Sequence, residues 1–368
     1  MTEAEAVIRR EIMDRGPMTL ARFMELALYA PGVGYYERPE CVVGRVGDFY
    51  TSVSVGPMFG FLIASRVAAW TPGWERIEVL EAGAHDGRLA ADILSALAEH
   101  HPACFERVTY HLLEPSPVRR ERQRAMLAAY ANRVVWHEGW EASTVPAGGV
   151  LVANELLDAF PVHRYGWSAS ERRWYECGVG LSGEQLEWCR LPTGPEFEVP
   201  ELAEIEPWLR DGWICEQSPA AAAWWRQACR RWRRGWMVTF DYGHEQRWGW
   251  RPERPEGSLR AYSAHRVSDR VLADPGGQDL TAHVNFGDLV RVAEQEGWRV
   301  ETHEPQGRVL TRWAAEILAG GGDGAAWIQS HARQLQTLTH PTHLGQAFRA
   351  LVQSKGTNPG DAAGSGPE

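Results

Sequence analysis

The sequence predicts an α/β fold of the doubly wound class, in which helices cover both faces of a mainly parallel sheet. Three observations support this prediction. Strand-like and helix-like stretches alternate from Arg76 to Glu155, a glycine-containing turn follows the first strand, and an aromatic-rich region later interrupts the alternation. Strands that alternate with helices need right-handed crossovers, which produce parallel pairing. We therefore expect ligands to bind beyond the carboxyl ends of the strands.

The elements follow in a regular order. Apolar residues recur at helical spacing after the first strand, and residues 117–130 form a second helix candidate. Residues 165–190 contain short strand candidates that predict an antiparallel insertion. The stretch "WMVTFDYG" then resumes the sheet, and a helix near 286–296 precedes a last strand pair near 298–311. The first four strand candidates are "RIEVLEA", "VTYHLLEPS", "RVVWHEG" and "GGVLVANE".

Composition excludes several classes of function. The formal net charge of −10 disfavours nonspecific nucleic-acid binding, which requires phosphate neutralisation. The six cysteines form no Cys-x-x-Cys pair, which argues against a metal site or a disulfide framework. The N-terminal stretch "MTEAEAVIRREIMDRG" has no apolar signal-peptide core, and no run approaches the roughly 18 apolar residues that span a bilayer. We therefore expect a cytoplasmic protein without membrane insertion.

The stretch "VLEAGAHDGRLAADIL" has the pattern of a cofactor-binding turn. A glycine after a strand lets the backbone approach a ligand, and the amide groups at the start of the next helix can then bind it. Gly83 and Gly87 occupy these positions, and Glu81 lies at the end of the strand. Glu114 ends the next strand, where it can accept hydrogen bonds from ribose hydroxyls. The alternative is that the glycines only permit a tight turn and that Glu114 is a solvated acid.

A second polar cluster follows the fourth strand. The stretch "VANELLDAFPV" places Asn154, Glu155 and Asp158 at this strand end. Two carboxylates and an amide are costly to bury without partners, so the cluster predicts a site that faces the substrate. A purely structural capping role for Asp158 is the alternative.

These motifs together resemble the MidA-like class I methyltransferases, a family that includes a mitochondrial assembly factor of respiratory complex I. The similarity extends from about Gly16 to Gly307. It implies a Rossmann-like, seven-stranded methyltransferase sheet with S-adenosyl-L-methionine as cofactor. The mitochondrial member is regarded as a protein arginine methyltransferase. The segments that carry the resemblance are "GPMTLARFMELALYAPGVGYY", "VGDFYTS…FG", "EAGAHDG", "LEPSP…RQ", "NELLDAFPV", "DYG", "GSLRAY" and "DLTAHVNF".

The resemblance also implies roles for individual residues. Gly83 and Gly87, with Glu81, would hold the cofactor, and Glu114 would bind its ribose. From the N-terminal segment, Gly47, Asp48 and Phe49 would line the cofactor pocket. This sequence departs from the family pattern at His85, where the family has glycine, and at Val53, where a proline is expected. A side chain at position 85 either crowds the cofactor or points outward.

The implied reaction transfers a methyl group to an arginine side chain of a protein substrate, with a respiratory-complex subunit as one candidate. Glu155 and Asp158 would grip the guanidinium, and Asn154 would position it. His265, Asp279 and His283 should border the pocket, and His283 would accept the departing proton. Two alternatives stay open. One is an inactive assembly scaffold, and the other is a nicotinamide-dependent oxidoreductase, although the chain lacks a matching G-x-G-x-x-G.

These interpretations divide the chain into five segments. An N-terminal helical segment (1–75) covers the cofactor pocket and precedes the first part of the methyltransferase domain (76–164). A substrate-side insertion and helix (165–235) separates this part from the second (236–353). The polar, Gly/Pro-rich tail (354–368) should be disordered.

Overall fold

The structure is a computed structural model that describes residues 2–38, 51–142, 144–192, 209–245, 254–263 and 266–357. The chain forms two compact units, and each combines three separate stretches of sequence. The first unit contains residues 1–49, 157–223 and 243–289, and the second contains residues 50–156, 224–242 and 290–368. The division into five consecutive sequence segments that is described above stays a prediction, because the two units are defined by spatial contacts and not by function.

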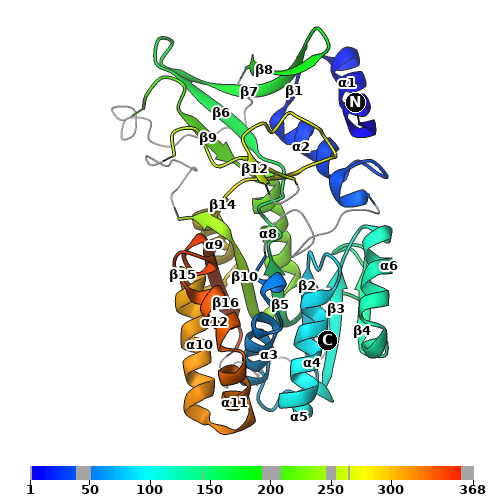
Figure 1. The fold of residues 1–368 in the computed structure, drawn as a ribbon, viewed down its shortest axis with the longest axis vertical. Coiled ribbons are helices and arrows are strands. Elements are labelled where there is room, and N and C mark those ends of the chain that lie inside the picture. Colours follow the sequence, from blue (N-terminus) through cyan, green and yellow to red (C-terminus); the bar gives the residue numbers. More distant parts are fainter. Residues whose placement is uncertain are drawn as a thin grey trace. The chain divides into compact units, whose positions relative to one another are not determined.

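The second unit is built on a twisted sheet with the strand order β15-β16-β10-β5-β2-β3-β4 (Figure 1). Strands β10, β5, β2, β3 and β4 pair in parallel, whereas β16 is antiparallel to both β10 and β15. The predicted α/β fold with a mainly parallel sheet is therefore confirmed. In the described residues the sheet has eight strands and not the predicted seven, because the short strand β14 (Val284–Asn285) also pairs in parallel with β10. The strands are β2 (Ile77–Ala82), β3 (Val108–Leu113), β4 (Val134–His137), β5 (Gly148–Asn154), β10 (Arg234–His244), β15 (Arg299–Pro305) and β16 (Phe348–Lys355).

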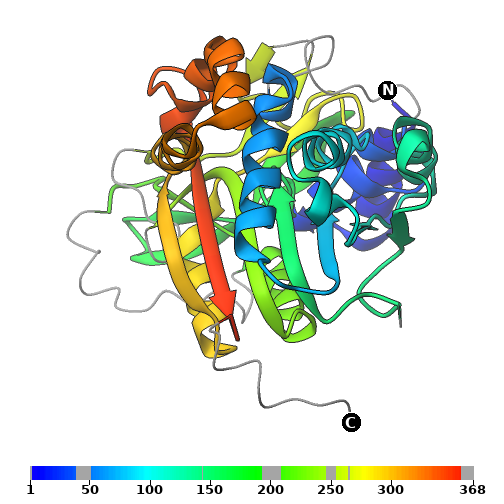
Figure 2. The ribbon, with the colours of Figure 1, turned by 90° about the horizontal axis from the view of Figure 1, so that it is seen from below.

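Both faces of this sheet are covered, which explains the continuous apolar runs of its strands. In β5, five consecutive residues from Gly149 to Ala153 are buried, as expected for a strand between two helical layers. Helix α3 lies on one side of the strands in Figure 2, and α8 and α9 lie on the other. The helices are α3 (Met58–Trp70), α4 (Arg88–His100), α5 (Pro102–Phe105), α6 (Pro117–Met126), α8 (Pro219–Arg231), α9 (Phe286–Gln295), α10 (Gln306–Gly320), α11 (Gly322–Ser330), α12 (Ala332–Thr339) and α13 (Leu344–Ala347).

The predicted strand pair near residues 298–311 is wrong in its second half. Strand β15 forms as expected, but residues 306–320 form helix α10. The buried residues Val309, Leu310, Trp313 and Ala314 of this helix recur at helical spacing and lie on one face. The antiparallel partner of β15 is β16, which lies more than 40 residues further along the chain.

The first unit contains the antiparallel insertion that the sequence predicts. Strands β1, β7, β6 and β9 form an antiparallel sheet, and β8 pairs with β7. A smaller sheet has the order β12-β11-β13. The strands are β1 (Met18–Thr19), β6 (His163–Ser168), β7 (Arg173–Ser182), β8 (Gln185–Leu191), β9 (Ile214–Gln217), β11 (Arg260–Ser263), β12 (Arg266–Ser268), β13 (Asp279–Thr281) and β14 (Val284–Asn285).

Two N-terminal helices complete this unit, α1 (Glu3–Arg15) and α2 (Leu20–Tyr29). Each begins after a threonine whose hydroxyl accepts a hydrogen bond from the first turn: Thr2 from Glu5 N at 3.0 Å and Thr19 from Arg22 N at 3.2 Å. Such caps satisfy backbone donors that would otherwise lack partners. In the part of the chain that the structure describes, no helix is both long and apolar enough to cross a membrane.

Candidate active site

The turn between β2 and α4 has the backbone conformation that a close ligand approach requires. Gly83 and Gly87 have φ angles of +76° and +87°, in the left-handed region that favours glycine. A β-carbon at Gly83 would lie 2.8 Å from Leu156 Cδ1, so the position is also too crowded for a side chain. Gly87 directly precedes helix α4, in which the first amide, Arg88 N, donates to Asp86 Oδ1 at 3.0 Å; the start of a helix offers further amide donors to a ligand. The turn therefore matches the predicted cradle for a polar ligand.

His85 occupies the centre of this turn in a left-handed conformation, with a φ angle of +45°. Glycine is favoured in this conformation, because a β-carbon in the left-handed region costs roughly 1–2 kcal/mol. The imidazole lies beside the next carboxylate, with Nδ1 4.0 Å from Asp86 Oδ1. Burial alone would raise the pKa of Asp86, but His85 and the backbone amide of Arg88 hold it below its usual value.

Glu114, at the end of β3, is buried with its carboxylate fixed in place. It is 1% exposed, and Oε1 accepts a hydrogen bond from the Ser116 backbone amide at 2.9 Å. Arg119 Nε lies 3.1 Å from the same oxygen, and Gln123 Nε2 donates to Oε2 at 3.2 Å. A cation and amide donors stabilise the ionised form of a buried carboxylate. Glu114 is therefore prepared to accept hydrogen bonds, as the sequence predicted for a ribose contact.

Glu81 lies at the end of the neighbouring strand β2 in a different environment. It is 2% exposed, and Tyr110 Oη donates a hydrogen bond to Oε2 at 2.7 Å. Burial raises the pKa of Glu81 to about 8, although the Tyr110 hydrogen bond acts in the opposite direction. The carboxyl is therefore protonated at neutral pH. Its predicted contact with the cofactor remains a prediction.

Glu155 follows β5 in a strained backbone conformation, with a φ angle of +49°. Its amide donates to Phe240 O at 2.9 Å, which fixes the turn against β10. Oε1 of its carboxylate accepts hydrogen bonds from the Ser52 amide at 3.2 Å and from Asn154 Nδ2 at 3.1 Å. Strain at a strand end marks functional sites more often than structural turns. The structure thus brings Asn154 and Glu155 together.

Two polar residues that the sequence analysis did not identify support Glu155. The Ser52 hydroxyl donates to Gln306 Oε1 at 3.2 Å, and Gln306 Nε2 donates to Leu338 O at 3.2 Å. Ser52 and Gln306 are both fully buried, at 0% exposure. Their side chains therefore hold the Ser52 amide toward the Glu155 carboxylate. In the sequence, the "TS" pair of the motif "VGDFYTS" indicates Ser52. Gln306 could not be predicted in the same way, because it lies 254 residues from Ser52 in the sequence.

In the first unit, Asp158 belongs to a cluster of acids and tyrosines. Asp158 is 7% exposed, and Asp279 is fully buried. Tyr36 Oη donates to Asp279 Oδ1 at 2.8 Å, and the Tyr29 and Tyr36 rings stack with centroids 5.5 Å apart. Burial raises the pKa of Tyr36 well above its usual value, and the charges of Asp279 and Asp158 add to this effect. Burial and the charge of Asp158 likewise raise the pKa of Tyr262. The sequence did not indicate these three tyrosines as site residues, because a single tyrosine in an apolar stretch is typical of core packing.

His283 is held by its backbone in the same unit. Its amide donates to Ser258 Oγ at 2.9 Å, and this hydroxyl donates to Glu216 Oε2 at 2.6 Å. Arg164 pairs with the same glutamate at 2.5 Å. These contacts join the "GSLRAY" and "DLTAHVNF" motifs. Gly47, Asp48 and Phe49, and also His265, lie outside the residues that the structure describes.

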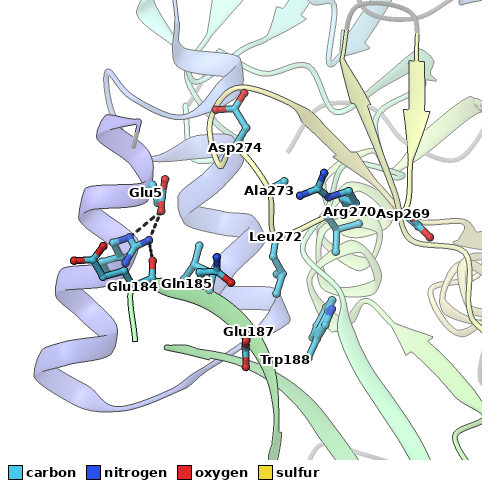
Figure 3. Close-up of a pocket in the computed structure, with 13 residues that line it drawn as sticks. Glu5, Glu184, Gln185, Glu187, Trp188, Asp269, Arg270, Leu272, Ala273 and Asp274 are labelled. Carbon is cyan, nitrogen blue, oxygen red and sulfur yellow. Dashed lines mark hydrogen bonds and ion pairs between the residues drawn. The ribbon is translucent and has the colours of Figure 1, made fainter. Parts of the chain in front are cut away.

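The first unit also carries an open groove of about 430 Å³ between its N-terminal helix and the β8 and Asp269–Asp274 segments (Figure 3). Its lining mixes acids with arginines, including Glu5, Arg9 and Arg270. Arg9 is already paired with Glu5 and with the Glu184 carbonyl. Among the described residues, none of the predicted site residues lines this groove. We assign it no part in the reaction.

Comparison with known proteins identifies the chemistry of this fold. Residues 62–304, more than half of the chain, match a family model described as "Putative S-adenosyl-L-methionine-dependent methyltransferase". The chain belongs to this methyltransferase family. The predicted MidA-like family membership and the prediction of an S-adenosyl-L-methionine-dependent methyltransferase are therefore confirmed.

Relatives of this methyltransferase have been named and solved. "Protein arginine methyltransferase NDUFAF7 homolog, mitochondrial" of Caenorhabditis elegans is 29% identical over 76% of this chain and 69% of its own. "Protein arginine methyltransferase NDUFAF7, mitochondrial" of Mus musculus is 29% identical over 77% of this chain and 68% of its own. A crystal structure of a Burkholderia thailandensis protein bound to S-adenosyl-homocysteine is 29% identical, with a TM-score of 0.81 over 99% of this chain and 95% of that one.

The residues of the second unit fit the cofactor of the family, S-adenosyl-L-methionine. The buried Glu114 carboxylate can accept hydrogen bonds from the ribose hydroxyls, and the glycine turn presents backbone amides at the start of α4. Gly83, Gly87 and Glu114 are therefore the residues that would hold it. When bound, S-adenosyl-L-methionine supplies an electrophilic methyl group on sulfur.

The predicted cytoplasmic location is wrong by this comparison. The relatives from Caenorhabditis elegans, Mus musculus and Homo sapiens are named as mitochondrial proteins, which contradicts the cytoplasmic prediction. The sequence argument relied on the missing apolar core of a secretory signal peptide. That criterion does not address mitochondrial targeting, which uses amphipathic and arginine-rich segments.

Proposed function

We propose that this methyltransferase modifies an arginine side chain of a protein substrate. Two lines of support exist for this acceptor. The relatives from Caenorhabditis elegans and Mus musculus are named protein arginine methyltransferases. Independently, the first unit joins Asp279, Tyr36 and Tyr29 through a hydrogen bond and a ring stack, and the charges of Asp158 and Asp279 act on both Tyr36 and Tyr262. A respiratory-complex subunit as the substrate stays a prediction from the family resemblance.

The acid–tyrosine cluster carries this proposal because it suits a guanidinium group. A guanidinium is planar and permanently charged, so carboxylates bind it through paired hydrogen bonds. Aromatic rings favour its flat faces through cation–π contacts. Asp158 and Asp279 supply negative charge among three aromatic rings, and Asp158 retains 7% exposure. A hydroxyl or thiol acceptor would have no need for this combination.

Each of the remaining predicted residues has a role in the proposed reaction. A guanidinium nitrogen forms a bond to the methyl carbon, the carbon–sulfur bond breaks, and one nitrogen proton is released. In the second unit, Glu155 is a proposed contact of the guanidinium, and Asn154 keeps the Glu155 carboxylate in place through its hydrogen bond at 3.1 Å. His283 would accept the released proton. Orientation and electrostatics are the contributions of the protein, because the methyl group is already activated.

The proposed acceptor can be tested with radiolabelled S-adenosyl-L-methionine and a mitochondrial protein extract. We expect the wild type to label methylarginine, which amino-acid analysis after hydrolysis identifies. Asp158→Ala should lower this labelling at least about 100-fold, because a charged contact to the acceptor is lost, while S-adenosylhomocysteine affinity stays within a few-fold. Glu187→Ala is the matched control, since Glu187 is an exposed acid of the same unit.

Two results would contradict the proposal. Label recovered in another amino acid or in a small molecule would exclude arginine as the acceptor. A large loss of cofactor affinity in Asp158→Ala would place this residue in the cofactor site instead.

A further inference from the structure

Gln123, in helix α6, joins two parts of the candidate cofactor site through one side chain. It is fully buried, at 0% exposure. Nε2 donates to the His85 carbonyl at 3.0 Å and to Glu114 Oε2 at 3.2 Å. Oε1 accepts from Trp136 Nε1 at 3.1 Å. The residue also packs on the turn, because a β-carbon at Gly87 would lie 3.4 Å from Gln123 Cα.

The orientation of this amide is determined by its partners. The indole Nε1 of Trp136 can only donate, so the Gln123 oxygen must face it. Both hydrogens of Nε2 then point to acceptors, the His85 carbonyl and the Glu114 carboxylate. A buried amide that satisfies all of these partners holds them at fixed positions, because each unmade bond would leave a buried polar group unpaired.

We propose that Gln123 is a positioning residue for the cofactor, which sets the glycine turn and the Glu114 carboxylate relative to each other. The hydrogen bond to the His85 carbonyl also holds the left-handed backbone that a histidine would otherwise resist. This inference rests on the cofactor roles proposed for Gly83, Gly87 and Glu114.

The first test replaces the amide with an apolar side chain of similar length. Gln123→Met should weaken S-adenosylhomocysteine binding about 10-fold to 100-fold, as measured by isothermal titration calorimetry. Gln227→Met is the matched control, since Gln227 is also a helical glutamine whose Nε2 donates to a glutamate, Glu141, at 3.1 Å. The control should bind like the wild type. Equal affinities of Gln123→Met and the wild type would overturn the proposal.

The second test separates positioning from packing. Gln123→Glu keeps the shape but places a carboxylate beside Glu114 and the His85 carbonyl, while Arg119 stays near Glu114 in both proteins. Two adjacent carboxylates favour sharing one proton. The variant should therefore bind S-adenosylhomocysteine weakly at pH 8 and recover most of its affinity near pH 5.5, relative to the wild type at each pH. A loss that does not depend on pH would indicate a packing defect and contradict the proposal.

The third test measures the link to His85. In a His85→Gly background the turn no longer depends on Gln123 to hold a left-handed histidine, so Gln123→Met should cost less affinity than in the wild type. A cost of the same size in both backgrounds would overturn this part of the inference. A wild type that binds no S-adenosylhomocysteine would instead contradict the cofactor site itself, and the two failures are thus distinguishable.

Discussion

The ends of strands β2 and β3 carry two glutamates with nearly the same burial and opposite chemistry. Glu81 is 2% exposed and Glu114 is 1% exposed. Among the residues that the structure describes, Glu81 contacts a tyrosine hydroxyl but no cation. Glu114 contacts Arg119, the Ser116 amide and the Gln123 amide. The partners of a buried carboxylate, more than its burial, therefore decide whether it stays ionised.

This difference separates two residues that the sequence predicts to have similar roles. Glu81 is protonated at neutral pH and bonded to Tyr110, which fits a residue of the core below the turn. Glu114 has a charge-stabilising environment and fits an acceptor for hydroxyl groups. Three substitutions test the contrast.

The largest effect is expected for Glu81→Gln at alkaline pH. The folded protein holds the Glu81 proton up to about pH 8, whereas the unfolded chain releases it near pH 4.5. The free energy of unfolding of the wild type therefore falls as pH rises through this window. Glu81→Gln removes this titration. Its free energy of unfolding should therefore be higher than that of the wild type by about 5 kcal/mol above pH 8, with little difference below pH 4.5.

Urea denaturation at several pH values measures this difference. Glu106→Gln, an exposed acid of the same unit, is the control and should follow the wild type. A Glu81→Gln variant that is equally or less stable than the wild type at pH 9 would show that folding does not raise the pKa of Glu81, and the contrast with Glu114 would disappear.

A smaller effect is expected for Glu114→Gln. The amide keeps the size of the side chain but removes the charge that ribose hydroxyls would bind. Hydrogen bonds to charged groups contribute about 1.5–3 kcal/mol, so S-adenosylhomocysteine affinity should fall about 10-fold to 100-fold. Calorimetric titration checks this prediction, and Glu106→Gln, at an exposed acid of the same unit, is the control whose affinity should stay near that of the wild type. Unchanged affinity in Glu114→Gln would remove Glu114 from the cofactor site.

The smallest effect is expected for His85→Gly. Its φ angle of +45° is unfavourable for a side chain, so glycine should raise the free energy of unfolding by about 1 kcal/mol. S-adenosylhomocysteine affinity should be equal or better. Thermal unfolding and calorimetry check the two results. A collapse in affinity would mean that the imidazole itself contacts the cofactor.

The sequence predicts most of the sheet correctly because the signals for its strands, helices and turns lie within short stretches of sequence. The apolar runs of β2, β3, β4 and β5 and the intervening helical spacing appear at their observed places, and Gly83 and Gly87 define the turn between β2 and α4. The last strand was misplaced because β16 lies far from β15 in sequence and its pairing is a tertiary property. Helix α10 was recognisable from local pattern, because Val309, Leu310, Trp313 and Ala314 recur at helical spacing.

The candidate site is less predictable because its residues depend on long-range contacts. The motifs indicated Glu114, Asn154, Glu155 and Asp158, and they also contain Ser52 and Gln123, but they do not show which atoms these two residues contact. Gln123 reaches a carbonyl 38 residues away, and Ser52 reaches Glu155 across 103 residues. The environments of Glu81 and Glu114 likewise come from neighbouring elements, so the two acids look equivalent in the sequence.

Hydrogen–deuterium exchange with and without S-adenosylhomocysteine tests most directly whether the β2–α4 turn and Glu114 form the cofactor site. We expect the ligand to slow exchange in peptides that cover Gly83–Arg88 and Glu114–Ser116, and NADH to leave both segments unchanged. Slower exchange only in other segments, or protection of the turn by NADH and not by S-adenosylhomocysteine, would contradict this assignment.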